Sequence, residues 1–317
     1  MRHLLEFEKP IAELEAQLDE LRGSAATDGN HSVAQEAAGI AAKIDRQLAG
    51  IYGKLTPWQK AQVARHPERP KALAYIAELF TEYTPLAGDR AFAEDAAIVG
   101  GMGRFRGTPV MVIGTEKGVD LDTRLKHNFG SARPEGYRKA RRLIELAGRF
   151  KLPILTFVDT AGAYPGIDAE ARGQAEAIAR SIEACLAAPV PIIATIIGEG
   201  GSGGAIALGA GDRVMMLEHA TYSVISPEGC ASILWRDAAG AAQAAEAMRI
   251  TAEDLKNLKL IDEIIAEPVG GAHRTPERAI RATGDAIAAA LPALMKQAPA
   301  ALLARRREKF LAMGRES

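Results

Sequence analysis

Apolar and acidic residues alternate at helical spacing near the start of the chain. The apolar positions recur every three or four residues with Glu and Asp between them, which predicts an amphipathic helix seated after Pro10. The apolar stripe consists of Phe7, Ile11, Leu14, Leu18 and Leu21. Such a stripe could pack on its own domain or against another subunit, and the pattern leaves both interpretations open.

Local signals predict several further helices before residue 96. Residues 24–32 are small and polar and predict a loop, and a second helix is expected over 33–52. Thr56 followed by Pro57 is typical of a helix N-cap with proline in the first turn. We expect this helix to run to residue 64, to be broken by residues 66–70, and to be followed by helical spacing over 71–80.

From residue 96 the pattern changes to strands that alternate with helices. Two strands are expected over 96–105 and 109–114, joined by a turn at 106–108. The later elements expected are a helix over 134–150, a strand over 152–158, a helix over 169–187, a strand over 190–197, a short helix over 202–210, strands over 212–218 and 221–225, a helix over 226–235, a helix starting at Thr251, a strand-like segment over 261–265 and a helical tail after Pro276. This alternation predicts an α/β domain with mainly parallel strands.

Two glycine-rich loops follow two of the apolar strand-like runs. The first covers 159–166 and includes Gly162 and Gly166, and the second covers 198–205 and contains five glycines. Because glycine has no Cβ, its backbone N–H can approach a ligand closely, and a helix that starts after such a loop adds unpaired donors. The pair of loops therefore predicts a site that holds oxyanions, such as a thioester enolate or a urea-like carbonyl.

The second loop also matches two other motifs. Residues 198–203 fit the G-x-G-x-x-G dinucleotide pattern, but the helix that follows is too short for a normal crossover. Residues 200–204 fit the G-x-S-x-G nucleophile elbow, with Ser202 as nucleophile and Asp237 or Asp262 and His273 in the expected order. A serine hydrolase thus stays an alternative, whereas the P-loop pattern fails because Ala205 stands where lysine is needed.

Composition narrows the class of protein further. The chain of 317 residues carries a formal net charge of −1 and 5% aromatic residues, which gives no reason to expect nucleic acid as a partner. Cys185 and Cys230 are the only cysteines and are expected to be buried free thiols, with no metal site on this chain. The acidic N-terminus does not resemble a signal peptide, and the longest apolar stretch, 184–198, contains two prolines. We expect a cytoplasmic protein with no membrane contact.

Several long segments resemble the carboxyltransferase alpha subunits of bacterial acetyl-CoA carboxylase. The segments that carry the resemblance are 10–15, 86–90, 97–101, 134–140, 198–205, 222–235 and 267–273. They extend over nearly the whole chain. One departure is Ala161, where the family usually has proline after Asp-Thr, and another is the pair Asp120 and Asp122, where relatives are often more basic.

The resemblance implies a crotonase-like ββα spiral with an N-terminal helical extension. It predicts a helical extension over 1–54, a carboxyltransferase domain over 55–293 and a helical tail over 294–317. The implied reaction moves a carboxyl group from carboxybiotin on a biotin carboxyl carrier protein to acetyl-CoA, giving malonyl-CoA for fatty acid synthesis. The implied assembly is an α2β2 heterotetramer with a beta subunit, working beside biotin carboxylase. A non-catalytic scaffold is the remaining alternative.

The same resemblance suggests roles for residues of both loops. The N–H groups around Gly203, Gly204, Gly162 and Ala163 are predicted to polarise the biotin ureido oxygen. The residues predicted to line the cofactor pocket, where carboxybiotin and the coenzyme A thioester meet, are Gly166, Gly200, Gly201 and Tyr164.

Overall fold

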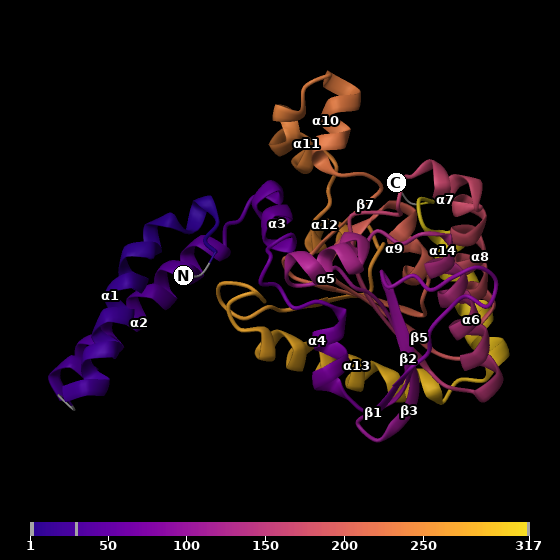
Figure 1. Cartoon of the computed structure of the whole chain (residues 1–317), viewed down its shortest axis with the longest axis horizontal. Helices are drawn as coiled ribbons and strands as arrows, with labels where there is room; N and C mark the ends of the chain where they lie inside the picture. The colour runs from indigo at the N-terminus through magenta and orange to yellow at the C-terminus, as the bar shows by residue number, and fades with distance from the viewer. Residues whose placement is uncertain (1–2, 29–30, 316–317) are drawn as a thin grey trace.

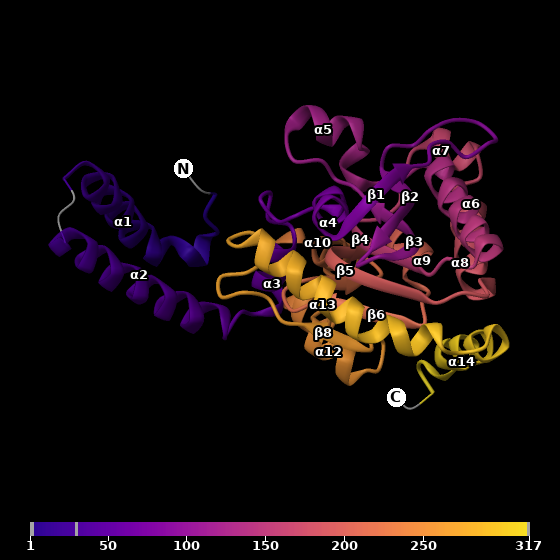
Figure 2. The ribbon, with the colours of Figure 1, turned by 90° about the horizontal axis from the view of Figure 1, so that it is seen from below.

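The computed structural model describes residues 3–28 and 31–315. The chain starts with a helical hairpin made of η1 (Glu6–Glu8), α1 (Lys9–Asp28) and α2 (His31–Tyr52). Figures 1 and 2 show this hairpin projecting to one side of the body of the molecule. The prediction of a loop over 24–32 is wrong for most of these residues, because 24–28 belong to α1 and 31–32 belong to α2. Residues 29 and 30 lie outside the described part of the chain.

The apolar stripe of α1 packs within its own chain. Ile11 is fully buried and Leu18 nearly so, in a cluster with Ile44, Leu48 and Tyr52 of α2. The remaining stripe residues are partly buried and pack against that cluster: Phe7, Leu14 and Leu21. Of the two interpretations of the stripe, packing on its own domain is therefore the one that the structure supports.

One mixed sheet organises the body of the molecule. Its strands are β1 (Phe80–Pro85), β2 (Ile98–Phe105), β3 (Thr108–Thr115), β4 (Ile154–Thr160), β5 (Ile192–Gly201), β6 (Arg213–Leu217), β7 (Thr221–Ser223) and β8 (Glu263–Ile265). The order is β1-β2-β3-β4-β5-β6-β8, with β7 paired to β5. The first three strands are antiparallel to one another, and the pairs from β3 to β8 are parallel. Every residue of β4 is buried, as expected for a parallel strand covered on both faces.

Helices cover both faces of this sheet. The remaining elements are α3 (Pro57–Ala64), α4 (Ala72–Leu79), α5 (Leu121–Lys126), η2 (Asn128–Gly130), α6 (Pro134–Phe150), α7 (Ile167–Ala171), α8 (Gln174–Ala187), α9 (Ser202–Gly209), α10 (Pro227–Trp235), η3 (Ala238–Gly240), α11 (Ala241–Ala247), α12 (Ala252–Asn257), α13 (Pro276–Met295) and α14 (Pro299–Ala312). Figure 2 shows α13 lying along the lower side of the sheet, while α6 and α8 lie together at the end away from the hairpin.

The predicted helix starts at Thr56, Ser226 and Thr251 are confirmed. Each of these side chains accepts a hydrogen bond from an N–H of the first helical turn. Helix boundaries set by such caps are local, because the capping group and the donor lie three residues apart.

Other boundaries differ from the prediction. The helix expected over 169–187 is broken, because Gly173 adopts a φ of +82° between α7 and α8. The strand expected to stop at residue 197 continues to Gly201, because residues 199–201 pair with β7. Strand β1 was not predicted at all, and Phe80, expected at a helix end, begins this strand against Phe105.

The C-terminal helix is fastened to the body by a buried arginine. Arg306 of α14 forms an ion pair with Asp212 at 2.6 Å and donates to the carbonyls of Cys185, Ala188 and Val190. Both cysteines are free thiols as predicted, although only Cys185 is fully buried.

No single helix among the described residues is long and apolar enough to cross a membrane. Helices α13 and α14 together pass a test of length and composition, but the chain bends by 120° between them.

Candidate active site between the two glycine loops

The first glycine loop is folded back on the end of β4. The Thr160 hydroxyl accepts the N–H of Gly162 at 3.0 Å and donates to the Gly162 carbonyl at 2.9 Å. Gly162 has a φ of +148°, a conformation that side chains rarely allow. Further along, the N–H of Tyr164 donates to the Ala132 carbonyl at 3.0 Å. The Gly162 N–H is therefore engaged within the loop, and this glycine contributes its backbone shape.

The second loop lies in direct contact with the first. A Cβ placed on Gly201 would lie 2.2 Å from the Ala161 oxygen, and one placed on Gly204 would lie 2.9 Å from the Ala163 nitrogen. Real Cβ atoms do not approach backbone this closely, so both positions require glycine. The structure thus brings together the loops that the sequence placed apart, and it explains the density of glycine by the approach of two backbones. Gly203 differs, since a Cβ there would meet only Ile178 at 3.4 Å.

Helix α9 directs unpaired backbone donors into this contact. It begins at Ser202, its N-cap is Gly201, and no side chain caps it. The N–H groups of its first turn, those of Gly203 and Gly204 included, have no acceptor within the helix. The positive end of the helix dipole adds to their attraction for an oxyanion. Such an arrangement can hold a carbonyl oxygen on which negative charge develops.

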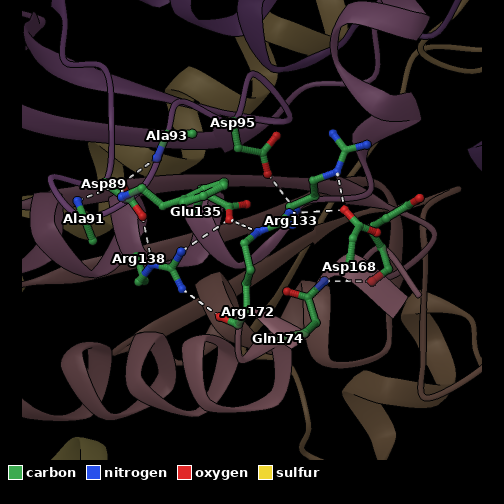
Figure 3. A network of polar contacts seen from close by, with 12 residues as sticks. Asp89, Ala91, Ala93, Asp95, Arg133, Glu135, Arg138, Asp168, Arg172 and Gln174 are labelled. Carbon is green, nitrogen blue, oxygen red and sulfur yellow. Dashed lines mark hydrogen bonds and ion pairs between the residues drawn. The ribbon is translucent and has the colours of Figure 1, made fainter. Parts of the chain in front are cut away.

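A network of polar side chains lies next to the first loop, and Figure 3 shows its members Arg133, Arg172 and Gln174. The Arg133 guanidinium lies over the Tyr164 ring, with 4.6 Å between its central carbon and the ring centroid. Gln174 donates to the Tyr164 carbonyl at 2.8 Å, and Arg172 donates to Glu135 at 2.6 Å. The Tyr164 ring folds onto Gly166, where a Cβ would lie 2.2 Å from a ring carbon. Two residues predicted to line the pocket, Tyr164 and Gly166, thus pack against each other in one turn.

Charged residues that the sequence analysis missed surround the ends of β4 and β5. Buried Asp159 pairs with Lys117 at 2.7 Å, and Lys117 also reaches Glu199 at 2.6 Å. Burial alone would raise the pKa of the Asp159 carboxyl, but Lys117 and Lys71 hold it at about 2. Against the effect of burial, Asp159 and Glu199 raise the pKa of Lys117. Asp159 therefore stays ionised at neutral pH, and so does Lys117.

The residues proposed for a hydrolase triad lie in separate environments. His273 stacks on His66, with ring centroids 3.9 Å apart, and lies 3.7 Å from the Glu8 carboxylate. Asp262 pairs with Lys309, and Asp237 accepts the Ala239 N–H at the start of η3. None of these three side chains makes a contact with Ser202 among the interactions of the described residues, so a relay to that hydroxyl is not assembled.

One cluster of side chains that could bind a metal ion instead links the helical hairpin to the body of the molecule. Glu8, His66 and His273 gather their ligand atoms within 4.8 Å of one another. Both ring nitrogens of His66 are already engaged, one with the His3 carbonyl at 2.9 Å and the other with the Glu68 N–H at 3.2 Å. Glu8 in turn accepts from Tyr52 and Arg274. This cluster fastens the helical hairpin to the body.

Comparison with solved structures first shows which known folds the chain shares. The chain superposes on transcarboxylase 12S, with methylmalonyl-coenzyme A and methylmalonic acid bound, at a TM-score of 0.58, with 18% identity over 72% of this chain and 43% of that one. It also superposes on the beta subunit of P. aeruginosa geranyl-CoA carboxylase at a TM-score of 0.56, with 18% identity over 77% of this chain and 46% of that one. The chain therefore spans less than half of either polypeptide. The chain shares the fold of these two proteins, and the predicted crotonase-like fold is confirmed.

Sequence comparison then gives the family. Residues 4–314 match the family described as acetyl co-enzyme A carboxylase carboxyltransferase-like. The acetyl-coenzyme A carboxylase carboxyl transferase subunit alpha of Acidiphilium cryptum (strain JF-5) is 70% identical over 315 residues, which are 99% of this chain and 98% of that relative. The chain belongs to the family of acetyl-CoA carboxylase carboxyl transferase alpha subunits. The predicted carboxyltransferase class is confirmed, and neither the hydrolase nor the scaffold is favoured.

Proposed function

We propose that this chain, together with a beta subunit, transfers a carboxyl group from carboxybiotin to acetyl-CoA and so forms malonyl-CoA. The carboxybiotin is carried on a biotin carboxyl carrier protein and regenerated by biotin carboxylase, and the assembly is an α2β2 heterotetramer in the cytoplasm. The observation that carries the proposal is the contact of the two glycine loops, with Gly204 of α9 seated against Gly162 and Ala163. Membership of the carboxyl transferase alpha subunit family indicates which reaction this contact would serve.

The backbone donors of this contact suit a urea-like carbonyl. The first-turn N–H groups of Gly203 and Gly204, with that of Ala163 nearby, would donate to the biotin ureido oxygen. Donors fixed in this way stabilise the charge that develops as the bond between the ureido nitrogen and the carboxyl group breaks. Breaking that bond would release CO2 and leave the electron pair on the ureido nitrogen, which would take a proton from the acetyl methyl group. The resulting enolate carbon would then attack the CO2 to form the new carbon–carbon bond. No side-chain base is needed from this chain.

Exposed apolar side chains around the loops support a protein partner on this face. Ile167, which follows the first loop, is 87% exposed, and Ile206 of α9 is 41% exposed. On α10 and the segment before it the exposed apolar residues are Val224, Ile233, Leu234 and Trp235. Apolar side chains grouped beside a site are typical of a surface that another protein covers. In the proposal the beta subunit covers this face and completes the thioester pocket.

Gly204→Val tests the role of the loop contact. The new side chain would collide with the Ala163 nitrogen and with the Gly162 carbonyl carbon, 2.9 and 3.0 Å from the Cβ position, and would push the donors apart. Losing one well-placed donor costs about 10²–10³ in rate. We expect at least that loss of carboxyl transfer in complexes that still assemble with the beta subunit.

A matched control separates this effect from a general intolerance of valine. Gly50 lies on α2, where a Cβ would meet no atom within 4 Å. Gly50→Val should leave carboxyl transfer unchanged. Normal turnover by assembled Gly204→Val complexes would refute the assignment of this loop.

A further inference from the structure

We propose that Lys117 is a positioning residue that sets the spacing of the two glycine loops by bridging the acidic side chains at their roots. The inference rests on the proposed function, since it assigns a residue to the same site. Lys117 lies in the segment after β3, away from both loops in the sequence. Its ammonium group lies 2.7 Å from Asp159 of β4 and 2.6 Å from Glu199 of β5.

The bridge lies where the strand ladder is irregular. Residues of β4 and β5 pair in step up to Val158 with Ile196, but the next pair is Thr160 with Gly200. Strand β5 therefore holds two extra residues opposite Asp159. In this interval the contacts between the strands are made by side chains, because the Asp159 carboxylate accepts the Glu199 N–H at 2.9 Å. The interval leads directly into both glycine loops.

Two glycines shape the chain around the bridge. A Cβ on Gly198 would lie 2.5 Å from the Asp159 carboxylate, so glycine is required where this side chain crosses to β5. Gly130, at a φ of +77°, makes room for the stem of Lys117, since a Cβ there would lie 2.7 Å from its Cγ. The backbone beside Lys117 is fixed as well, because the Glu116 carboxylate accepts the N–H of Gly118 at 2.7 Å. The lysine is held before any substrate binds.

Within the described part of the chain, no other cation contacts both carboxylates. Lys71 reaches Asp159 only at 3.6 Å, on its other oxygen. Arg65 pairs with Glu199 at 2.6 Å but makes no contact with Asp159 among the described interactions. Without Lys117, two carboxylates would face each other across the irregular interval, and like charges in a buried site repel. We expect the strand ends to separate and the donors of the two loops to lose their alignment.

The test measures kinetics of the complex assembled with the beta subunit. Lys117→Met keeps the length of the side chain but removes its charge, and we expect kcat to fall about 10²-fold, the cost of a shift of roughly 1 Å at a reacting group. KM for acetyl-CoA should stay within about twofold of wild type. Lys117→Arg, which can span both carboxylates, should recover at least a tenth of the wild-type kcat. The control Lys43→Met changes an exposed lysine of α2 and should have no effect.

A second variant and a second measurement keep the inference testable if Lys117→Met folds poorly. Glu199→Gln leaves the pair of Asp159 and Lys117 intact and should lower kcat about tenfold. Amide hydrogen exchange over 160–166 and 198–204 should speed up in both variants relative to Lys43→Met. Inactive wild-type complexes would contradict the proposed function, while exchange would still test the bridge. Wild-type exchange rates in both variants, or a kcat within twofold of wild type, would overturn the inference.

Discussion

At the scale of single residues, the two loops use glycine for different physical reasons. Gly201 and Gly204 are needed because another backbone occupies the space of a Cβ, whereas Gly162 is needed for its φ of +148°. Ser202 stands between them with a φ of +51°, which is unfavourable for serine. Strain of this kind is most common at functional sites, and here it falls on the first residue of α9.

Ser202 itself is predicted to contribute only its backbone. Ser202→Ala keeps every N–H of the loop, so it should retain at least half of the wild-type carboxyl transfer by the assembled enzyme. A fluorophosphonate probe should not label the wild-type chain, because His273 and both candidate aspartates are engaged elsewhere. Labelling of Ser202, together with complete loss of activity in the alanine variant, would restore the hydrolase interpretation.

The residues of the site could be predicted from the sequence only where their signal is local. The glycine loops are short runs, so Gly162, Gly203 and Gly204 stand out. Lys117 does not, because its partners Asp159 and Glu199 come from other strands and only the fold brings them near. One usable signal was present, namely an aspartate at the end of a largely apolar run, because a buried aspartate needs a charged partner.

At the scale of elements, boundaries with a local sequence signal could also be predicted, and boundaries set by distant segments could not. The starts of α3, α10 and α12 depend on a capping side chain that accepts an N–H three residues later, and they were predicted correctly. The extension of β5 to Gly201 depends on β7, and β1 exists because it pairs with β2. These boundaries are set by pairing between distant segments, which no local pattern encodes.

The contact between hairpin and body is a buried polar cluster with a definite response to pH. Glu8 accepts the Leu5 N–H at 2.8 Å and the Tyr52 hydroxyl at 3.0 Å, and it pairs with Arg274 at 2.8 Å. Burial opposes ionisation, but His273, Leu5 and Arg274 hold the pKa of Glu8 at about 2. Burial, aided by His273, lowers the pKa of His66 to about 4.

The signs of both pKa shifts predict loss of stability in acid. The contribution of neutral His66 is fully present above its ordinary pKa of 6.5 and declines as pH falls towards 4. The contribution of ionised Glu8 to stability is fully present above its ordinary pKa of 4.5 and is lost as the pH falls through about 2. We expect Tm to fall between pH 6.5 and 4, and His66→Gln to flatten that fall. An equally steep fall in His66→Gln would contradict this account of the contact.

At the scale of the whole molecule, the sheet places both loops on one side and leaves that side partly apolar. The antiparallel strands β1 to β3 form one edge, and the parallel strands β4 and β5 end together at the site. The helical hairpin stands apart from this face (Figure 1) and buries its own stripe. These features fit the proposal that a second subunit covers this side and completes the site.

The most direct test of this account is reconstitution from purified components. Formation of malonyl-CoA from acetyl-CoA and carboxybiotin should be measured with this chain alone, with the beta subunit alone and with both. The account predicts activity only when both subunits are present, and sedimentation should show a hetero-oligomer under the same conditions. Malonyl-CoA formed at full rate without this chain, or by this chain as a stable monomer, would contradict it.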